Sequence, residues 1–197
     1  MKELFAAFNT DFFRALSTLV IPGGIAVSTW SIQLLLIFEP LKRLVSQNHV
    51  EASLVMFLII VFAGLVIEDI GARLEDAMDQ RAVEATKGKH RQDWYAYLRT
   101  AFVCELIGRR YIRTLVTRLK FELGTAVGIL IGNIGLIVLW IEGFVSYKFS
   151  LIVLMLSLLI AAYLALLEAP ASHRLLATAR SEMLDKIRVV SSAGAEP

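Results

Sequence analysis

Residues 52–67 read ASLVMFLIIVFAGLVI and carry no charged side chain, whereas the next twelve residues, EDIGARLEDAMD, carry six. Water is absent from the core of a lipid bilayer, so an apolar run that crosses it must pair its backbone groups internally as a helix. No residue at the junction is a strong helix terminator. We therefore predict one helix that leaves the membrane and continues to about Ala85, where Lys87, Gly88 and Lys89 end it.

Three further apolar segments accompany this one. Together they predict membrane spans at about 17–38, 52–70, 122–141 and 149–168, each close to the ~20 residues that a helix needs to cross ~30 Å of hydrocarbon. The composition agrees, because 57% of the 197 residues are hydrophobic and the mean hydropathy is +0.66. The sequence predicts an all-α, four-span helical integral membrane protein that forms a single membrane domain over residues 1–197.

The basic residues are distributed unevenly between the two sides of such a membrane protein. Seventeen of the 20 Lys and Arg residues fall before the first span, between spans two and three, or after the fourth; the other three are Lys42, Arg43 and Lys148. Lys- and Arg-rich segments stay in the cytoplasm. We expect a bacterial-type inner-membrane protein with both termini, residues 71–120 and the tail 171–197 in the cytoplasm. The single Cys104 cannot form an internal disulfide and suits that reducing compartment.

Residues 71–120 are expected to form a cytoplasmic helical hairpin between spans two and three. Its first helix places Glu68, Glu75 and Asp79 on one stripe, since positions seven and eleven apart lie close in angle on a helix. Its second helix is predicted to begin at Asp93, a good N-cap residue, and to run toward the third span.

Charged residues gather at the cytoplasmic ends of spans two and three. The acidic cluster is Glu68, Asp69, Glu75 and Asp79, and the basic cluster is Arg109, Arg110, Arg113, Arg118 and Lys120. One interpretation is a set of ion pairs that hold the hairpin together, with arginines reaching lipid phosphates. The other is a site for an anionic ligand, a lipid headgroup or an acidic partner surface. Lipid is a simpler partner than nucleic acid for a basic helix that lies against the membrane.

Glycines recur every four residues in the third span, at Gly124, Gly128 and Gly132. Such a face lacks side chains and allows another helix to approach closely. Spacing alone leaves two partners open: the fourth span of the same chain, or the same helix of another subunit in a homo-oligomer. Asn133 lies mid-span, where we expect its amide to bind a neighbouring helix, because an unpaired amide there is costly.

Patterns typical of catalytic or metal sites are weak in this sequence. The three histidines, His49, His90 and His173, are far apart, and no His or Cys pair has metal-ligand spacing. We therefore expect no metal, cofactor or catalytic residue. His90 falls at a turn, where a solvated role is the commoner one.

A short segment resembles part of a known motif. Asp69, Gly71, Ala72 and Arg73 resemble part of the aspartate-rich motif of CDP-alcohol phosphotransferases, which use metal-bound carboxylates at cytoplasmic helix ends. The chain lacks that family's adjacent Asp-Gly pair and its later glycine and two aspartates, and it has four spans where the family typically has six. We therefore do not assign the chain to it.

Three functions follow as hypotheses. The first is a non-enzymatic sensor, scaffold or effector subunit, in which membrane disturbance moves the hairpin and a cytoplasmic protein partner responds; a stress or phage-defence setting would suit it. The second is an oligomeric ion channel, although Gln33 and Asn133 supply only a sparse polar stripe. The third is a lipid-modifying enzyme that uses Glu68, Asp69 and Glu75.

Overall fold

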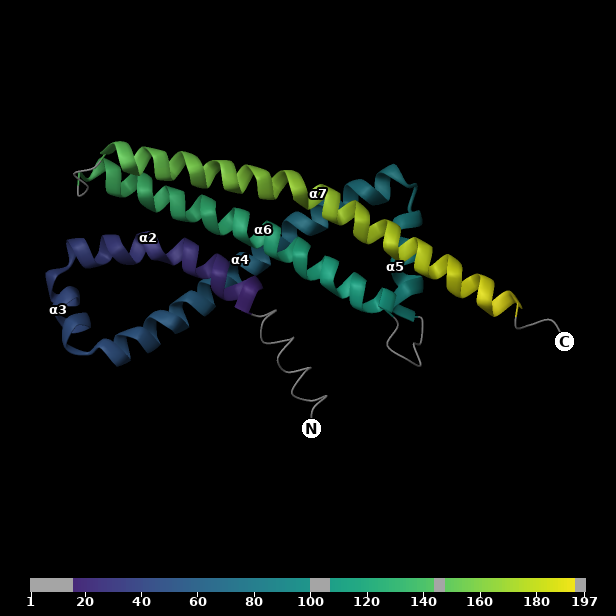
Figure 1. The fold of residues 1–197 in the computed structure, drawn as a ribbon, viewed down its shortest axis with the longest axis horizontal. Coiled ribbons are helices and arrows are strands. Elements are labelled where there is room, and N and C mark those ends of the chain that lie inside the picture. Colours follow the sequence, from purple (N-terminus) through teal and green to yellow (C-terminus); the bar gives the residue numbers. More distant parts are fainter. Residues whose placement is uncertain (1–15, 100–106, 144–147, 194–197) are drawn as a thin grey trace. The chain divides into compact units, whose positions relative to one another are not determined.

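The computed structural model describes residues 16–99, 107–143 and 148–193, and the described residues contain helices and short turns but no strand (Figure 1). The prediction of an all-α protein is confirmed. The elements in chain order are a π-helical turn η1 (Leu16–Val20) and the α-helices α2 (Ile21–Ile37), α3 (Glu39–Gln47), α4 (His49–Ala85), α5 (Lys89–Arg99), α6 (Ile107–Ile141) and α7 (Lys148–Ala193). Cys104 falls outside the described residues.

Four helical segments are long and apolar enough to cross a membrane, which confirms the predicted multi-pass membrane class. They are Leu16–Ile37, His49–Ala85, Tyr111–Ile141 and Phe149–Asp185. The second of them, α4, has 37 residues, or about 55 Å at 1.5 Å per residue. That length exceeds the ~30 Å of hydrocarbon in a bilayer, so the charged half of α4 extends beyond its apolar run. The helix ends at Ala85, as predicted.

The chain divides into two compact units. The first unit comprises Met1–Ala72 and Lys120–Leu167, and the second comprises Arg73–Leu119 and Glu168–Pro197. Three helices, α4, α6 and α7, contribute residues to both units without a break in the helix.

Within the first unit, η1 and α2 pack on α4 through two glycines. A Cβ atom on Gly23 would collide with the carbonyl oxygen of Ile60, and one on Gly64 would collide with that of Leu19. The change from π-helix to α-helix falls between Val20 and Ile21, one residue before Pro22, which lacks a backbone N–H group. Small residues therefore set how closely these two helices approach.

The glycine face of α6 also packs on α2. A Cβ atom on Gly128 would lie 2.6 Å from the carbonyl oxygen of Pro22, and one on Gly132 would lie 2.9 Å from that of Ile25. A Cβ atom on Gly124 would lie 3.4 Å from the Cγ atom of the Pro22 ring. Two partners were considered for this face from the sequence: the fourth span, or a second subunit. In the structure, α2 packs on it. The first span of the same chain thus packs on this face, and the homo-oligomer stays a prediction.

Five polar side chains are buried in the described part of the first unit: Thr18, Thr29, Gln33, Glu122 and Asn133. Asn133 is 3% exposed, and its Nδ2 donates to the carbonyl of Ile129 at 3.2 Å, one turn earlier in α6. The partner shown for this amide therefore lies in its own helix, not on the neighbouring helix expected from the sequence. Gln33 Nε2 donates to Glu142 Oε2 at 3.0 Å, joining the ends of α2 and α6.

The turn between α4 and α5 depends on backbone conformations with positive φ. Lys87 has φ 51° and Gly88 has φ 85°, and the Gly88 N–H donates to the carbonyl of Val83 at 2.9 Å. Glycine adopts this conformation without the steric cost that a Cβ atom imposes. Helix α5 begins at Lys89, four residues before the predicted Asp93. Its described part ends at Arg99, so the prediction of a helix running on to the third span falls partly outside the described residues.

The second unit has a core of its own along α7. Buried positions recur at helical spacing on one face of that helix, and three of them are polar or charged: Ser172, His173, Leu176, Arg180 and Leu184. A buried histidine and a buried arginine need partners, because desolvating such groups without compensation is costly.

Candidate functional site

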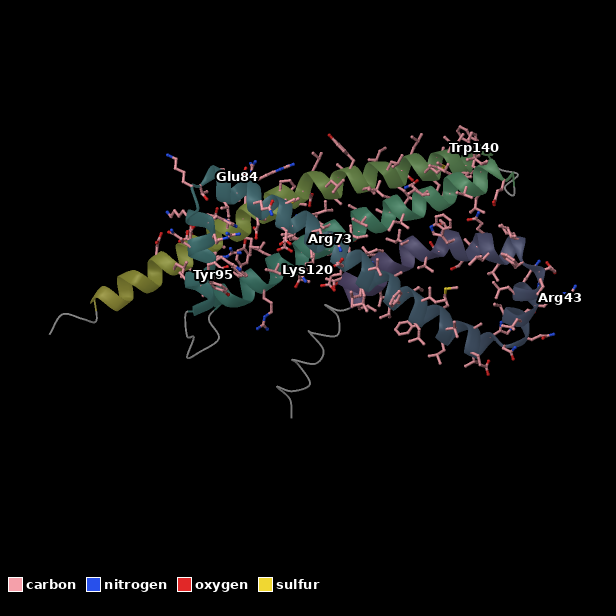
Figure 2. All side chains as sticks on the ribbon, turned by 180° about the vertical axis from the view of Figure 1, so that it is seen from behind. Arg43, Arg73, Glu84, Tyr95, Lys120 and Trp140 are labelled. Carbon is pink, nitrogen blue, oxygen red and sulfur yellow. The ribbon has the colours of Figure 1, made fainter. Side chains whose placement is uncertain are left out.

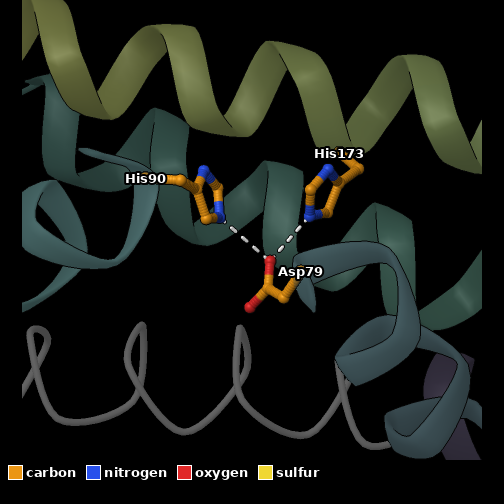
Figure 3. A group of neighbouring side chains, drawn as sticks. All are labelled: Asp79, His90 and His173. Carbon is orange, nitrogen blue, oxygen red and sulfur yellow. Dashed lines mark hydrogen bonds and ion pairs between the residues drawn. The ribbon is translucent and has the colours of Figure 1, made fainter. Parts of the chain in front are cut away.

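Three side chains from three helices converge in the second unit (Figure 3). The Nε2 atom of His90 lies 3.0 Å from Asp79 Oδ1, and the Nε2 atom of His173 lies 2.7 Å from the same oxygen. Asp79 belongs to α4, His90 to α5 and His173 to α7. We call these three residues the histidine cluster.

The local sequence fixes His90 through the turn that precedes it. Thr86 Oγ1 donates to the carbonyl of Ala82 at 2.7 Å and accepts from the backbone N–H of His90 at 3.2 Å. The threonine thus satisfies a donor at the start of α5 that would otherwise lack an intrahelical partner. Together with the Gly88 turn, this bond sets the first turn of α5 against the end of α4.

The two histidines are well shielded from solvent. Each imidazole is 9% exposed, whereas the Asp79 carboxylate is 46% exposed. The two rings lie 5.6 Å apart between centroids. The solvated role expected for His90 from its position at a turn is therefore wrong: the turn folds the ring back against α4 and α7.

Electrostatics favour an ionised carboxylate in the cluster. Asp79 lies beyond the apolar run of α4 and outside the span predicted at about 52–70. Partial burial alone would raise its pKa, but hydrogen bonds and charge from His173 and His90 outweigh that effect and hold the pKa of Asp79 below its ordinary value. The carboxylate is thus a charged acceptor at neutral pH.

A buried cation lies near the histidine cluster. Arg180 is 5% exposed, and its guanidinium carbon lies 4.0 Å from the centroid of the Trp94 ring, a cation–π contact. Its charge interacts favourably with Asp79, Glu75 and Asp93. Carboxylates therefore balance the arginine within the second unit.

A cavity of about 460 Å³ adjoins Asp79 and His90. Its wall also includes Asp76, Glu84, Trp94 and Tyr95; Glu84 and Tyr95 are labelled in Figure 2. Three acidic and two aromatic side chains, together with His90 and Arg91, thus line a space that a small ligand or several water molecules could fill.

The predicted charge clusters are divided between the units. Glu68 and Lys120 pair at 2.7 Å in the first unit, each about one-third exposed. Arg118 pairs at 2.7 Å with Glu168 of α7, a residue outside the predicted acidic cluster. The other predicted residues whose side chains are described also have interaction partners: Asp69, Glu75 and Arg113. The side chains of Arg109 and Arg110 lie outside the described residues.

Asp79 belongs to the acidic stripe expected from the sequence, but its two histidine partners were not expected. They lie 11 and 94 positions away in the chain, so no local spacing connects them. A partial signal exists at helical spacing: His90, Trp94 and Tyr97 follow one face of α5, and His173, Leu176 and Arg180 follow one face of α7. Periodicity of this kind could have marked the buried faces, although not which faces meet.

The arrangement can hold a cation between two imidazoles and a carboxylate, or it can act as a hydrogen-bonded link between three helices. No protein-family model matches the sequence, and comparisons with curated proteins and with solved structures also give no match.

Proposed function

We propose that this chain is a non-enzymatic sensor, scaffold or effector subunit of the bacterial-type inner membrane, with both termini and the second unit in the cytoplasm. The observation that carries the proposal is the continuity of α4, α6 and α7, each of which supplies residues to both units. Helices α4 and α6 contain no proline and are stiff elements, whereas α7 has Pro170 close to the boundary. A change in the packing of the membrane spans therefore also displaces the residues of α4 and α6 in the second unit.

The expected partners fall into three kinds. Membrane lipid contacts the exposed apolar side of α4, which includes Leu54, Leu58 and Phe62. A cytoplasmic protein binds the second unit, where Glu84, Arg91 and Tyr95 are exposed. A second copy of the chain must use a face other than the glycine face of α6, because α2 covers that face.

The alternatives have less support in the geometry. A channel requires polar groups along a water-filled path, but Gln33 and Asn133 are buried between packed helices of the first unit. A lipid-modifying enzyme that uses Glu68 requires a carboxylate that is available for chemistry, and Glu68 is paired with Lys120 at 2.7 Å.

The coupling can be tested by measuring distances within the second unit. Spin labels at Arg91→Cys and Thr178→Cys, in a Cys104→Ser background, report on α5 and α7 of the full-length protein in bilayers of two thicknesses. We expect the distance distribution to differ between thin and thick bilayers, because the spans must tilt or repack to match the hydrocarbon. Identical distributions would contradict the proposal.

Two controls make the measurement specific. Ala72→Gly weakens α4 at the boundary between the units by about 1 kcal/mol without removing a packed side chain, so it should reduce the response. Ion flux through the same liposomes would favour the channel, and carboxylate-dependent phospholipid turnover would favour the enzyme.

A further inference from the structure

We infer that Asp79, His90 and His173 form a binding site for a divalent first-row transition-metal ion, for which Zn²⁺ is a suitable probe. This inference does not depend on the sensor role, because it rests only on the contacts within the second unit.

The ligand atoms are already gathered. One atom from each of the three side chains can be chosen so that all lie within 4.8 Å of one another, and the two nitrogen atoms lie 3.0 and 2.7 Å from the carboxylate oxygen. Ligands bound about 2.1 Å from a single ion lie roughly 3–3.5 Å apart. Small rotations that open the present contacts would therefore make room for the ion.

The chemistry of the donors selects the class of ion. Two imidazole nitrogens and one carboxylate oxygen suit Zn²⁺, Fe²⁺, Co²⁺ and similar ions, whereas Mg²⁺ and Ca²⁺ prefer sites made of oxygen atoms. Each Nε2 must present its lone pair to the metal. The proton that bonds it to Asp79 therefore moves to Nδ1 or leaves to solvent when the ion binds.

The burial of the three groups also fits a metal site. The histidine rings are 9% exposed, so protein and not water surrounds the nitrogen donors, while Asp79 is 46% exposed and leaves a route for the ion. Three protein ligands leave at least one coordination position open. Since Asp79 and His90 both line the 460 Å³ cavity, that position can be reached from this space.

The surrounding charge does not prevent a cation from binding. Arg180 is the buried cation that interacts electrostatically with Asp79, and Glu75 and Asp93 also oppose its charge. Asp76 and Glu84 add two carboxylates on the cavity wall, which also includes Arg91. Acidic groups thus outnumber the two arginines around the proposed ion.

An ion at this position would link α4, α5 and α7. An ion that binds only the folded state raises the free energy of unfolding. The increase grows with the logarithm of the ion concentration divided by the dissociation constant. Metal binding should therefore be visible as a rise in the thermal unfolding midpoint as well as in direct titrations.

The test uses the full-length protein, purified in detergent and stripped with a chelator. Titration with Zn²⁺ should show one saturable site per chain, and Co²⁺ should give visible d–d absorption bands typical of histidine ligation. Replacing any one ligand, as in His90→Ala, His173→Ala or Asp79→Asn, should weaken Zn²⁺ binding about 100-fold. The matched control is His49→Ala, which removes the one histidine outside the cluster and should leave the affinity unchanged.

Misfolding of a variant must be separated from the loss of a ligand. X-ray absorption of the wild-type protein with bound Zn²⁺ should therefore show two imidazoles and an oxygen donor in the first shell, a result that needs no variant. Saturable binding that His90→Ala and His173→Ala leave unchanged would overturn the inference. The absence of any Zn²⁺ binding by the wild-type protein would overturn it as well, leaving a hydrogen-bonded link between helices.

Discussion

Gly128→Leu is expected to destabilise the detergent-solubilised protein by about 3 kcal/mol or more, or to prevent it from folding. Even the first atom of a side chain at this position would lie 2.6 Å from the carbonyl oxygen of Pro22 and 3.2 Å from its Cα atom. These are backbone atoms of α2, so no flexible side chain can move aside. Packing is a principal force that holds helices together in a membrane, and loss of this contact separates α2 from α6.

The thermal unfolding midpoint measures this effect, and a matched pair of alanine variants makes it specific. Gly128→Ala should be destabilising by about 1–3 kcal/mol. Gly24→Ala adds the same methyl group to α2, where it would meet only the Ile60 Cγ2 atom, at 3.9 Å, and should be neutral or slightly stabilising, since alanine favours helix by up to about 1 kcal/mol. Equal losses in the two variants would contradict the packing described for α2.

Leu176→Ala is expected to lower the free energy of unfolding by about 2–5 kcal/mol, the usual cost of deleting a buried leucine side chain. Leu176 is 3% exposed on the buried face of α7, whereas its neighbour Leu175 is 49% exposed. Leu175→Ala makes the same chemical change in the same helix and should cost less than about 1 kcal/mol. Chemical denaturation of the full-length protein measures both.

The contrast between these two leucines tests whether the second unit has a core. A helix that merely lay on a membrane would bury its apolar side chains in lipid, and removing either leucine would leave the stability of the protein fold nearly unchanged. Equal effects of the two substitutions would therefore contradict the buried face along Ser172, Leu176 and Leu184.

The membrane spans could be predicted from sequence because the hydrophobicity of each one is a local property of a short segment. An uncharged run such as residues 52–67 has one low-energy state in a bilayer, and a Gly88 that adopts positive φ is a local reason for α4 to end at Ala85. The start of α5 was predicted less well, because Asp93 has the chemistry of an N-cap but the Thr86 side chain supplies the bond to His90 instead.

The helix that packs on each buried face could not be predicted, because tertiary packing and not local sequence decides which helices meet. The spacing of Gly124, Gly128 and Gly132 indicates a close approach, yet it applies equally to any helix with a smooth surface. In the structure that helix is α2, and the backbone of Pro22 packs against Gly128. The histidine cluster was missed for the same reason: His173 is 94 residues from Asp79, and only tertiary packing brings them together.

Site-directed labelling of the α4–α5 turn tests the central claim most directly. In a Cys104→Ser background, Lys89→Cys marks this turn and Lys42→Cys marks α3, and both positions are exposed. With a membrane-impermeant maleimide, the four-span topology predicts that Lys42→Cys reacts in intact spheroplasts and that Lys89→Cys reacts only after lysis. If Lys89→Cys were labelled in intact spheroplasts and Lys42→Cys were not, the result would contradict the claim that the second unit lies in the cytoplasm.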